Sequence, residues 1–161
     1  MSYEDIARHF IEGPGGLFDF YKYEMASPRF NVPELEGALI DQERNERLWK
    51  ACGFIRIPDI LNPDRHVWKC GQHHSRSLPK PDDLNALFRW AVSKVREKYA
   101  KGLDEIASYF EEGHEVSAIR YFPNGHDAID NYMAIITGEA DTPGKALFLA
   151  CEKALGLSPT P

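Results

Sequence analysis

Four side chains that can bind a metal ion lie within nine residues of one another. They are His66, Cys70, His73 and His74, and Cys52 lies on the strand predicted before them. Histidine and cysteine are ligands that zinc prefers, and a strand that ends in a loop can bring several of them together. The spacing lacks the paired Cys-x2-Cys or His-x3-His elements of structural zinc sites. We therefore expect no cofactor, and this cluster is where zinc would bind if the protein held it.

The same stretch holds the side chains of a cysteine-based active site. Cys70 could form a thiolate–imidazole dyad with His66 or His73 if its thiol were exposed beside positive groups. Lys69 and Arg76 would supply those groups, but a small core cysteine on a strand explains Cys70 equally well. The chain contains no nucleophile elbow, phosphate-binding loop or His-Glu-x-x-His sequence. The sequence leaves enzymatic activity undecided and favours a protein that is not an enzyme.

Two charged stretches are candidates for binding surfaces. The first is basic and partly aromatic, with Arg65, Trp68, Lys69 and Arg76. It could hold an anionic ligand, a nucleotide or an acidic partner, although solvation of a loop is the simpler explanation. The second is acidic, with Glu111, Glu112 and Glu115. It could imitate the charge of nucleic acid toward a basic protein, although the solvent-exposed face of a helix is again the simpler explanation.

Length and composition predict a single soluble domain. The chain has 161 residues, of which 43% are hydrophobic and 27% are charged, and this balance is ordinary for a globular protein. Its net charge of −6 opposes direct binding to nucleic acid and suits a basic protein partner. Three cysteines without a regular spacing fit a reducing compartment. No apolar run approaches the roughly 18 residues that a membrane span needs, so we expect a cytoplasmic protein without a membrane partner. Its oligomeric state stays open.

The elements that would position these side chains belong to one domain over residues 1–161, with an N-terminal arm over 1–33 and an α/β core over 34–157. Apolar residues at helical spacing predict two helices. Alternating apolar residues on either side of an Asn-Pro-Asp turn predict two strands. The helices cover residues 34–50 and 82–100, and the strands cover 52–60 and 65–70. On the first helix, Arg44 is expected to face solvent.

The last third of the chain changes its apolar period from that of a helix to that of a strand and back. The predicted order is helix, strand, strand and helix, over residues 103–113, 114–123, 130–140 and 143–157. In the pair of strands, Tyr132 to Ile136 should lie beside Val116 to Tyr121. Thr142 or Asp141 should cap the last helix, and Pro143 should begin it.

This pattern gives an α+β fold class, in which a small antiparallel sheet packs with helices and the chain ends in an αββα unit. The two clearest amphipathic helices should bury one face each. The residues expected to be buried there are Leu87, Ala91, Val95, Leu147, Cys151 and Ala154.

Three details of residues 103–157 carry a resemblance to a known family. Glu111-Glu112-Gly113-His114 leads from a helix into a strand, a second strand ends in Gly138-Glu139-Ala140-Asp141-Thr142-Pro143, and an Ala-rich helix follows. The stretch from Glu46 to Phe54 is similar to the first helix and strand of that family. The chain thus resembles small phage-encoded proteins with an α-β-α sandwich domain. That family has no general activity attached to it, so the resemblance carries over no catalytic residues.

The resemblance implies a non-enzymatic phage or prophage accessory protein that acts by binding in the cytosol of the host cell. A host protein is then its expected partner, and inhibition of a host factor or defence protein is one such role. Two other classes stay open. One is a metal-dependent or cysteine-based enzyme centred on residues 66–74, and the other is a protein that sequesters a small ligand or nucleotide.

Overall fold

The computed structural model describes residues 40–157 of the chain. The chain divides into two units, Met1–Val32 and Pro33–Pro161, and all described residues belong to the second. The arm predicted over 1–33, and the start of the helix predicted at residue 34, therefore lie outside the described residues. The described residues form an α+β domain, as the sequence predicts.

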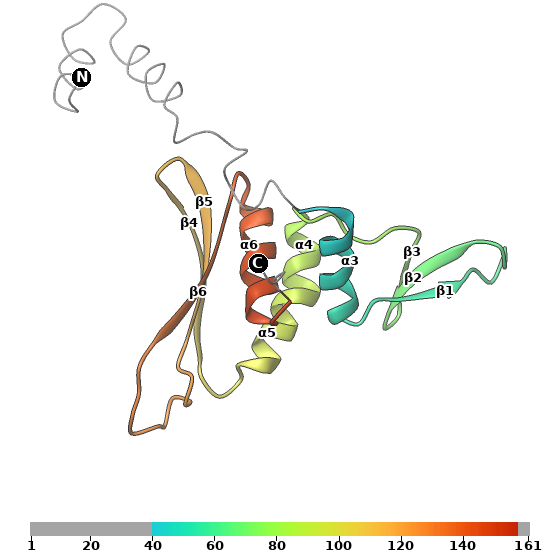
Figure 1. The fold of residues 1–161 in the computed structure, drawn as a ribbon. Coiled ribbons are helices and arrows are strands. Elements are labelled where there is room, and N and C mark those ends of the chain that lie inside the picture. Colours follow the sequence, from blue (N-terminus) through green and yellow to red (C-terminus); the bar gives the residue numbers. More distant parts are fainter. Residues whose placement is uncertain (1–39, 158–161) are drawn as a thin grey trace, which may run out of the picture. The chain divides into compact units, whose positions relative to one another are not determined.

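Helices and two small antiparallel sheets make up this domain (Figure 1). In chain order the elements are α3 (Gln42–Ala51), β1 (Ile55–Pro58), β2 (His66–Cys70), β3 (His73–Ser75), α4 (Leu84–Ala86), the π-helical turn η4 (Leu87–Ala91), α5 (Val92–Lys98), β4 (Leu103–Glu111), β5 (His114–Tyr121), β6 (Ala134–Ala140) and α6 (Pro143–Ala154). One sheet has the order β1-β2-β3 and the other the order β4-β5-β6. Helix α6 packs on one face of the second sheet, and the other helices lie on the far side of α6. None of the described helices is long and apolar enough to cross a membrane.

Helix α6 is the centre of the hydrophobic core. The Thr142 hydroxyl accepts a hydrogen bond from the Lys145 backbone N–H at 3.2 Å, and Pro143 follows it in the first turn, as predicted. Nine of the twelve residues of α6 are buried, because the sheet covers one side and the other helices cover another. The prediction of buried helix faces is confirmed, since all six residues are fully buried. They are Leu87, Ala91, Val95, Leu147, Cys151 and Ala154.

Gly138 allows β6 to approach α6 closely. A Cβ atom at this position would lie 2.2 Å from the carbonyl oxygen of Ala146 and 2.5 Å from the backbone nitrogen of Ala150. No side chain fits in that space, so only glycine permits this contact between strand and helix. The sheet is thereby held against the helix along the middle of β6.

The helix predicted over 103–113 is wrong, because these residues form strand β4. The unit at the end of the chain is therefore three strands followed by one helix. Ile106 and Phe110 are four residues apart, a spacing that fits one face of a helix and equally one face of a strand. Gly113, which suggested the end of a helix, instead lies in a two-residue turn between β4 and β5. Glu112 and Gly113 have φ angles of 48° and 85°, as the tight turn of a hairpin requires.

The remaining predicted elements are present, with shifted ends. Strands β5 and β6 pair in antiparallel fashion, with Tyr121 opposite Ala134, so β6 begins two residues after the expected Tyr132. The predicted pair of strands around the Asn-Pro-Asp turn is confirmed as β1 and β2. A third strand, β3, pairs with β2 in a segment where we predicted neither a helix nor a strand. The helix predicted over 82–100 begins at Leu84, where the Asp83 carboxylate caps it by accepting the Ala86 backbone N–H at 3.1 Å, and it contains η4.

Candidate binding sites

Four of the five candidate metal ligands lie at the ends and on both faces of the β1-β2-β3 sheet, and the fifth, Cys52, lies at the end of α3. His66 begins β2 and Cys70 ends it, so about 13 Å of strand separates them at a rise of ~3.3 Å per residue. His73 lies opposite Cys70, whereas His74 lies opposite Lys69 and therefore belongs to the other face. Among the described residues, no group of three or more His, Cys, Asp or Glu side chains could hold a metal ion.

The cysteines of this region belong to the hydrophobic core. Cys52 ends α3 and is buried, and burial, followed by the nearby Cys70 thiol, raises the pKa of Cys52 to about 12. The Cys70 thiol donates a weak hydrogen bond to the Cys52 carbonyl oxygen at 3.7 Å. Among the described contacts, neither His66 nor His73 is hydrogen-bonded to Cys70. The structure therefore brings Cys52 and Cys70 together, and among the described contacts Cys70 has no hydrogen bond to either histidine of the candidate dyad.

His73 is part of an aromatic cluster beside the π-helical turn. Its ring centroid lies 4.9 Å from that of Trp90 and 6.3 Å from that of Phe54. Phe54 and Trp90 meet edge to face at 5.0 Å, and the Arg89 guanidinium lies over the Trp90 ring at 4.6 Å. Such edge-to-face and cation–π geometries are favourable and fix the orientation of the rings.

A groove opens between this cluster and the segment that follows β3. Its volume is about 480 Å³, and its lining includes His73, Ser75, Ser77, Lys80, Arg89 and Trp90. Of the residues that line the groove, His73 is a candidate from the sequence, whereas Arg89 and Trp90 lie on a predicted helix and are not. Arg89 and Trp90 reach the groove together because they lie on the π-helical turn. The sequence carries no signal for this turn.

The basic stretch does not form a single surface. Arg65 is exposed in the turn between β1 and β2, and Arg76 is exposed after β3. Trp68 packs against the hydrophobic core, and Lys69 follows it on the opposite face of the strand. Trp68 and Lys69 therefore lie on opposite faces of β2, and Arg76 lies between Ser75 and Ser77, which line the groove.

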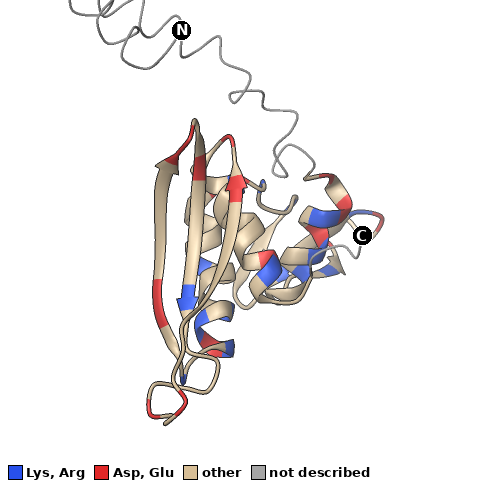
Figure 2. Ribbon diagram, turned by 60° about the vertical axis from the view of Figure 1, so that its left-hand side comes forward, with Lys and Arg blue, Asp and Glu red and all other residues tan. Residues whose placement is uncertain are grey.

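The acidic stretch lies at one end of the β4-β5-β6 sheet, and not on a helix as expected. Glu111 and Glu112 are exposed at the turn of the hairpin, and Glu115 lies opposite Ala140. The same register brings Glu139 and the following Asp141 to this end of the sheet. Figure 2 shows acidic residues at the same end of all three strands. We call these five residues the acidic edge: Glu111, Glu112, Glu115, Glu139 and Asp141.

Two exposed aromatic side chains adjoin the acidic edge. Phe110 lies opposite Glu115 and is 64% exposed, and Tyr109 is 39% exposed on the other face of β4. Within the acidic edge, Glu139 pairs with His114 at 3.4 Å and Asp141 with Lys145 at 3.2 Å. No ion pair to a described residue is formed by the carboxylates of Glu111, Glu112 and Glu115. The sequence did not reveal Phe110 or Glu139 as members of this region, because their positions depend on strand register.

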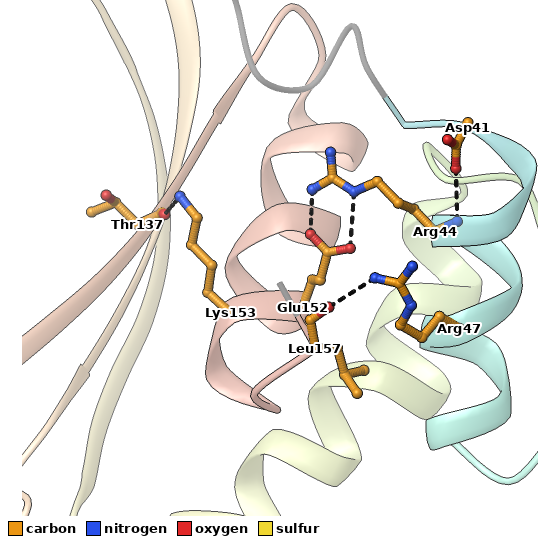
Figure 3. A network of polar contacts seen from close by, with 7 residues as sticks. All are labelled: Asp41, Arg44, Arg47, Thr137, Glu152, Lys153 and Leu157. Carbon is orange, nitrogen blue, oxygen red and sulfur yellow. Dashed lines mark hydrogen bonds and ion pairs between the residues drawn. The ribbon is translucent and has the colours of Figure 1, made fainter. Parts of the chain in front are cut away.

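A polar network holds the sheet and the helices together (Figure 3). The Arg44 guanidinium binds the Glu152 carboxylate through two hydrogen bonds, of which the one from Nε measures 3.1 Å. Both side chains are buried, so the prediction that Arg44 faces solvent is wrong. The Lys153 ammonium donates to the Thr137 carbonyl oxygen at 2.9 Å and ties α6 to β6. This network supports the sheet that carries the acidic edge.

Comparisons of the chain with known protein families, with curated proteins and with solved structures find no match.

Proposed function

We propose that this chain is a non-enzymatic accessory protein of phage or prophage origin that binds a basic host protein through the acidic edge. The observation that carries the proposal is the position of five carboxylates at one end of a single sheet, where Phe110 is also exposed beside Glu115. The resemblance of residues 103–157 to small phage-encoded proteins supports the origin. Inhibition of the bound host factor or defence protein is the expected consequence.

The charge distribution supports a basic partner. Residues 103–142 contain nine Asp and Glu and one Arg, whereas residues 52–81 contain five Lys and Arg and two Asp. The negative charge is therefore concentrated on the β4-β5-β6 sheet and the segments around it. A surface of one sign steers a partner of the opposite sign and raises the association rate, most strongly at low salt.

The exposed aromatic rings supply the apolar part of such an interface. Protein interfaces place their strongest contacts on a few large side chains, and charged groups around them set specificity. Phe110 offers an exposed ring that the partner would cover, and Tyr109 offers a second on the opposite face of the strand. The pairing of β4 with β5 and the packing of β5 and β6 on α6 hold these side chains on a fixed scaffold.

Affinity capture from host lysate tests this proposal. The bait proteins are the wild type, an acidic-edge variant and a matched control, each carrying three reversals of charge. The acidic-edge variant is Glu111→Lys, Glu112→Lys and Glu115→Lys. The control is Asp104→Lys, Asp127→Lys and Asp130→Lys, which alters exposed residues at or beyond the other end of the sheet.

The expected result is one basic protein that the wild type and the control capture and the acidic-edge variant loses. Equal capture of the partner by both variants would contradict the proposal. Loss of the partner from both variants would contradict it too, because it would indicate a response to net charge alone. Circular dichroism of each bait checks that the variants are folded.

A further inference from the structure

The groove beside Trp90 has the size and composition of a site for a small ligand. Its volume of about 480 Å³ lies within the range of roughly 300–1,000 Å³ that small-molecule sites occupy. Its wall includes the Trp90 ring, the His73 ring, and the hydroxyls of Ser75 and Ser77. The Asn85 side chain adds an amide. An aromatic wall with a few polar groups is typical of sites that bind a polar molecule with a ring.

Two cations, Lys80 and Arg89, line this groove. Among the described residues, neither Arg89 nor Lys80 lies within ion-pair distance of an Asp or Glu. Asp83 also lines the groove, but its carboxylate accepts the Ala86 backbone N–H at 3.1 Å and caps the helix. The two cations outnumber the one carboxylate on the lining, and an excess of positive charge in a groove favours an anionic ligand.

The aromatic cluster holds Arg89 in place before any ligand binds. The guanidinium lies over Trp90 at 4.6 Å, and the Trp90 ring is itself packed against those of Phe54 and His73. A guanidinium stacked on a ring keeps the N–H donors at its edge available, and these match the paired oxygens of a phosphate. The turn that carries Arg89 and Trp90 is π-helical, a distortion frequently found at functional sites.

From this geometry we infer that the groove binds a small phosphate-bearing ligand, with Arg89 and Lys80 holding the phosphate. The ring and hydroxyl groups of the wall would contact the rest of a phosphate ester, and a nucleoside monophosphate is the simplest probe of that class. This inference does not depend on the proposed function, because the acidic edge lies on a different sheet.

Calorimetric titration of the full chain tests the inference with three probes: AMP, inorganic phosphate and adenosine. The variants are Arg89→Gln and Lys80→Gln, which alter exposed side chains of the groove, and Arg96→Gln is the matched control. Arg96 is an exposed arginine on α5 that does not line the groove, and its variant loses the same charge. The acidic-edge triple variant is titrated as well.

AMP should bind, and adenosine should not. Loss of a charge-assisted hydrogen bond should weaken AMP binding about tenfold or more in Arg89→Gln and in Lys80→Gln. Arg96→Gln and the acidic-edge variant should bind like the wild type, even if the latter loses its host partner. Binding of AMP more tightly than phosphate would identify an ester as the ligand, whereas equal binding would identify phosphate itself. The inference is overturned if neither AMP nor phosphate binds, or if Arg89→Gln and Arg96→Gln have equal effects.

Discussion

Arg44 and Glu152 form a buried ion pair that joins α3 to α6 across 108 residues of the chain. Their side chains are 9% and 1% exposed, so both charges have left water. A second pair on α3, between Arg47 and Glu43 at 3.6 Å, is largely solvated, with the Glu43 side chain 85% exposed. The two pairs therefore allow a direct comparison of a buried and an exposed interaction on one helix.

Glu152→Ala should lower the free energy of unfolding by about 3–5 kcal/mol, because it removes the carboxylate that binds the buried Arg44 guanidinium through two hydrogen bonds. Chemical denaturation measures the change. Glu43→Ala, the matched control, should alter stability by no more than about 1 kcal/mol. An Arg44→Met, Glu152→Leu double variant should recover much of the loss, since it removes both charges of the pair. Equal effects of Glu152→Ala and Glu43→Ala would show that the buried pair is not formed.

Gly138→Ala should destabilise the domain by about 1–3 kcal/mol or more, because the added methyl group would force β6 away from α6. A Cβ atom there would lie 2.2 Å from the Ala146 carbonyl oxygen. Thr137→Ala, on the neighbouring residue of the same strand, changes a side chain on the opposite face and should cost less. Thermal unfolding of both variants measures the difference, and a neutral Gly138→Ala would contradict the packing of β6 on α6.

Glu112→Asn should stabilise the protein by about 0.5–1 kcal/mol, because Asn tolerates a positive φ better than Glu and Asn-Gly favours the tight turn of a hairpin. Glu112 has a φ of 48° and precedes Gly113. On a helix the same substitution would lower stability, since Asn is a poorer helix former than Glu. Urea denaturation therefore distinguishes the hairpin from the helix that the sequence suggests.

The buried thiols should make the domain less stable at high pH. Burial raises the pKa of Cys52 and of Cys151 from an ordinary value of about 9 to about 12. The folded state then holds protons that the unfolded state has lost, so stability is full below about pH 9 and falls as the pH rises toward 12. A Cys52→Ala, Cys151→Ala variant should show a shallower fall between these values. An unchanged slope would contradict the burial of both thiols.

The sequence correctly predicts those elements whose capping residues and apolar pattern match the way they pack in the domain. The Thr142 cap, the following Pro143 and the apolar face of α6 all indicate the same helix, and the structure contains it. The stretch over 103–113 misleads because Ile106 and Phe110 fit both periods, and only pairing with β5 decides between them. Tertiary contacts likewise decide the burial of Arg44, whose partner lies on a helix far away in sequence.

The candidate sites likewise contain some residues that the sequence reveals and others that only the fold brings together. The acidic residues of 111–115 are evident from the sequence, but their neighbours Glu139 and Asp141 join them only through strand register. The groove depends on η4, which brings Arg89 and Trp90 to His73, and composition carries no sign of that turn. The candidate metal ligands are close in sequence, but His66 and Cys70 are separated in space because they lie at the two ends of β2.

The association rate of the protein with its captured partner, measured against ionic strength, tests the central claim most directly. The wild type should associate fastest at low salt and slow as salt screens the acidic edge. At low salt, the variant with Glu111, Glu112 and Glu115 changed to Lys should associate about tenfold more slowly or worse, while the Asp104, Asp127 and Asp130 control stays close to the wild type. A rate that is independent of salt, or a control that slows as much as the acidic-edge variant, would contradict binding through this edge.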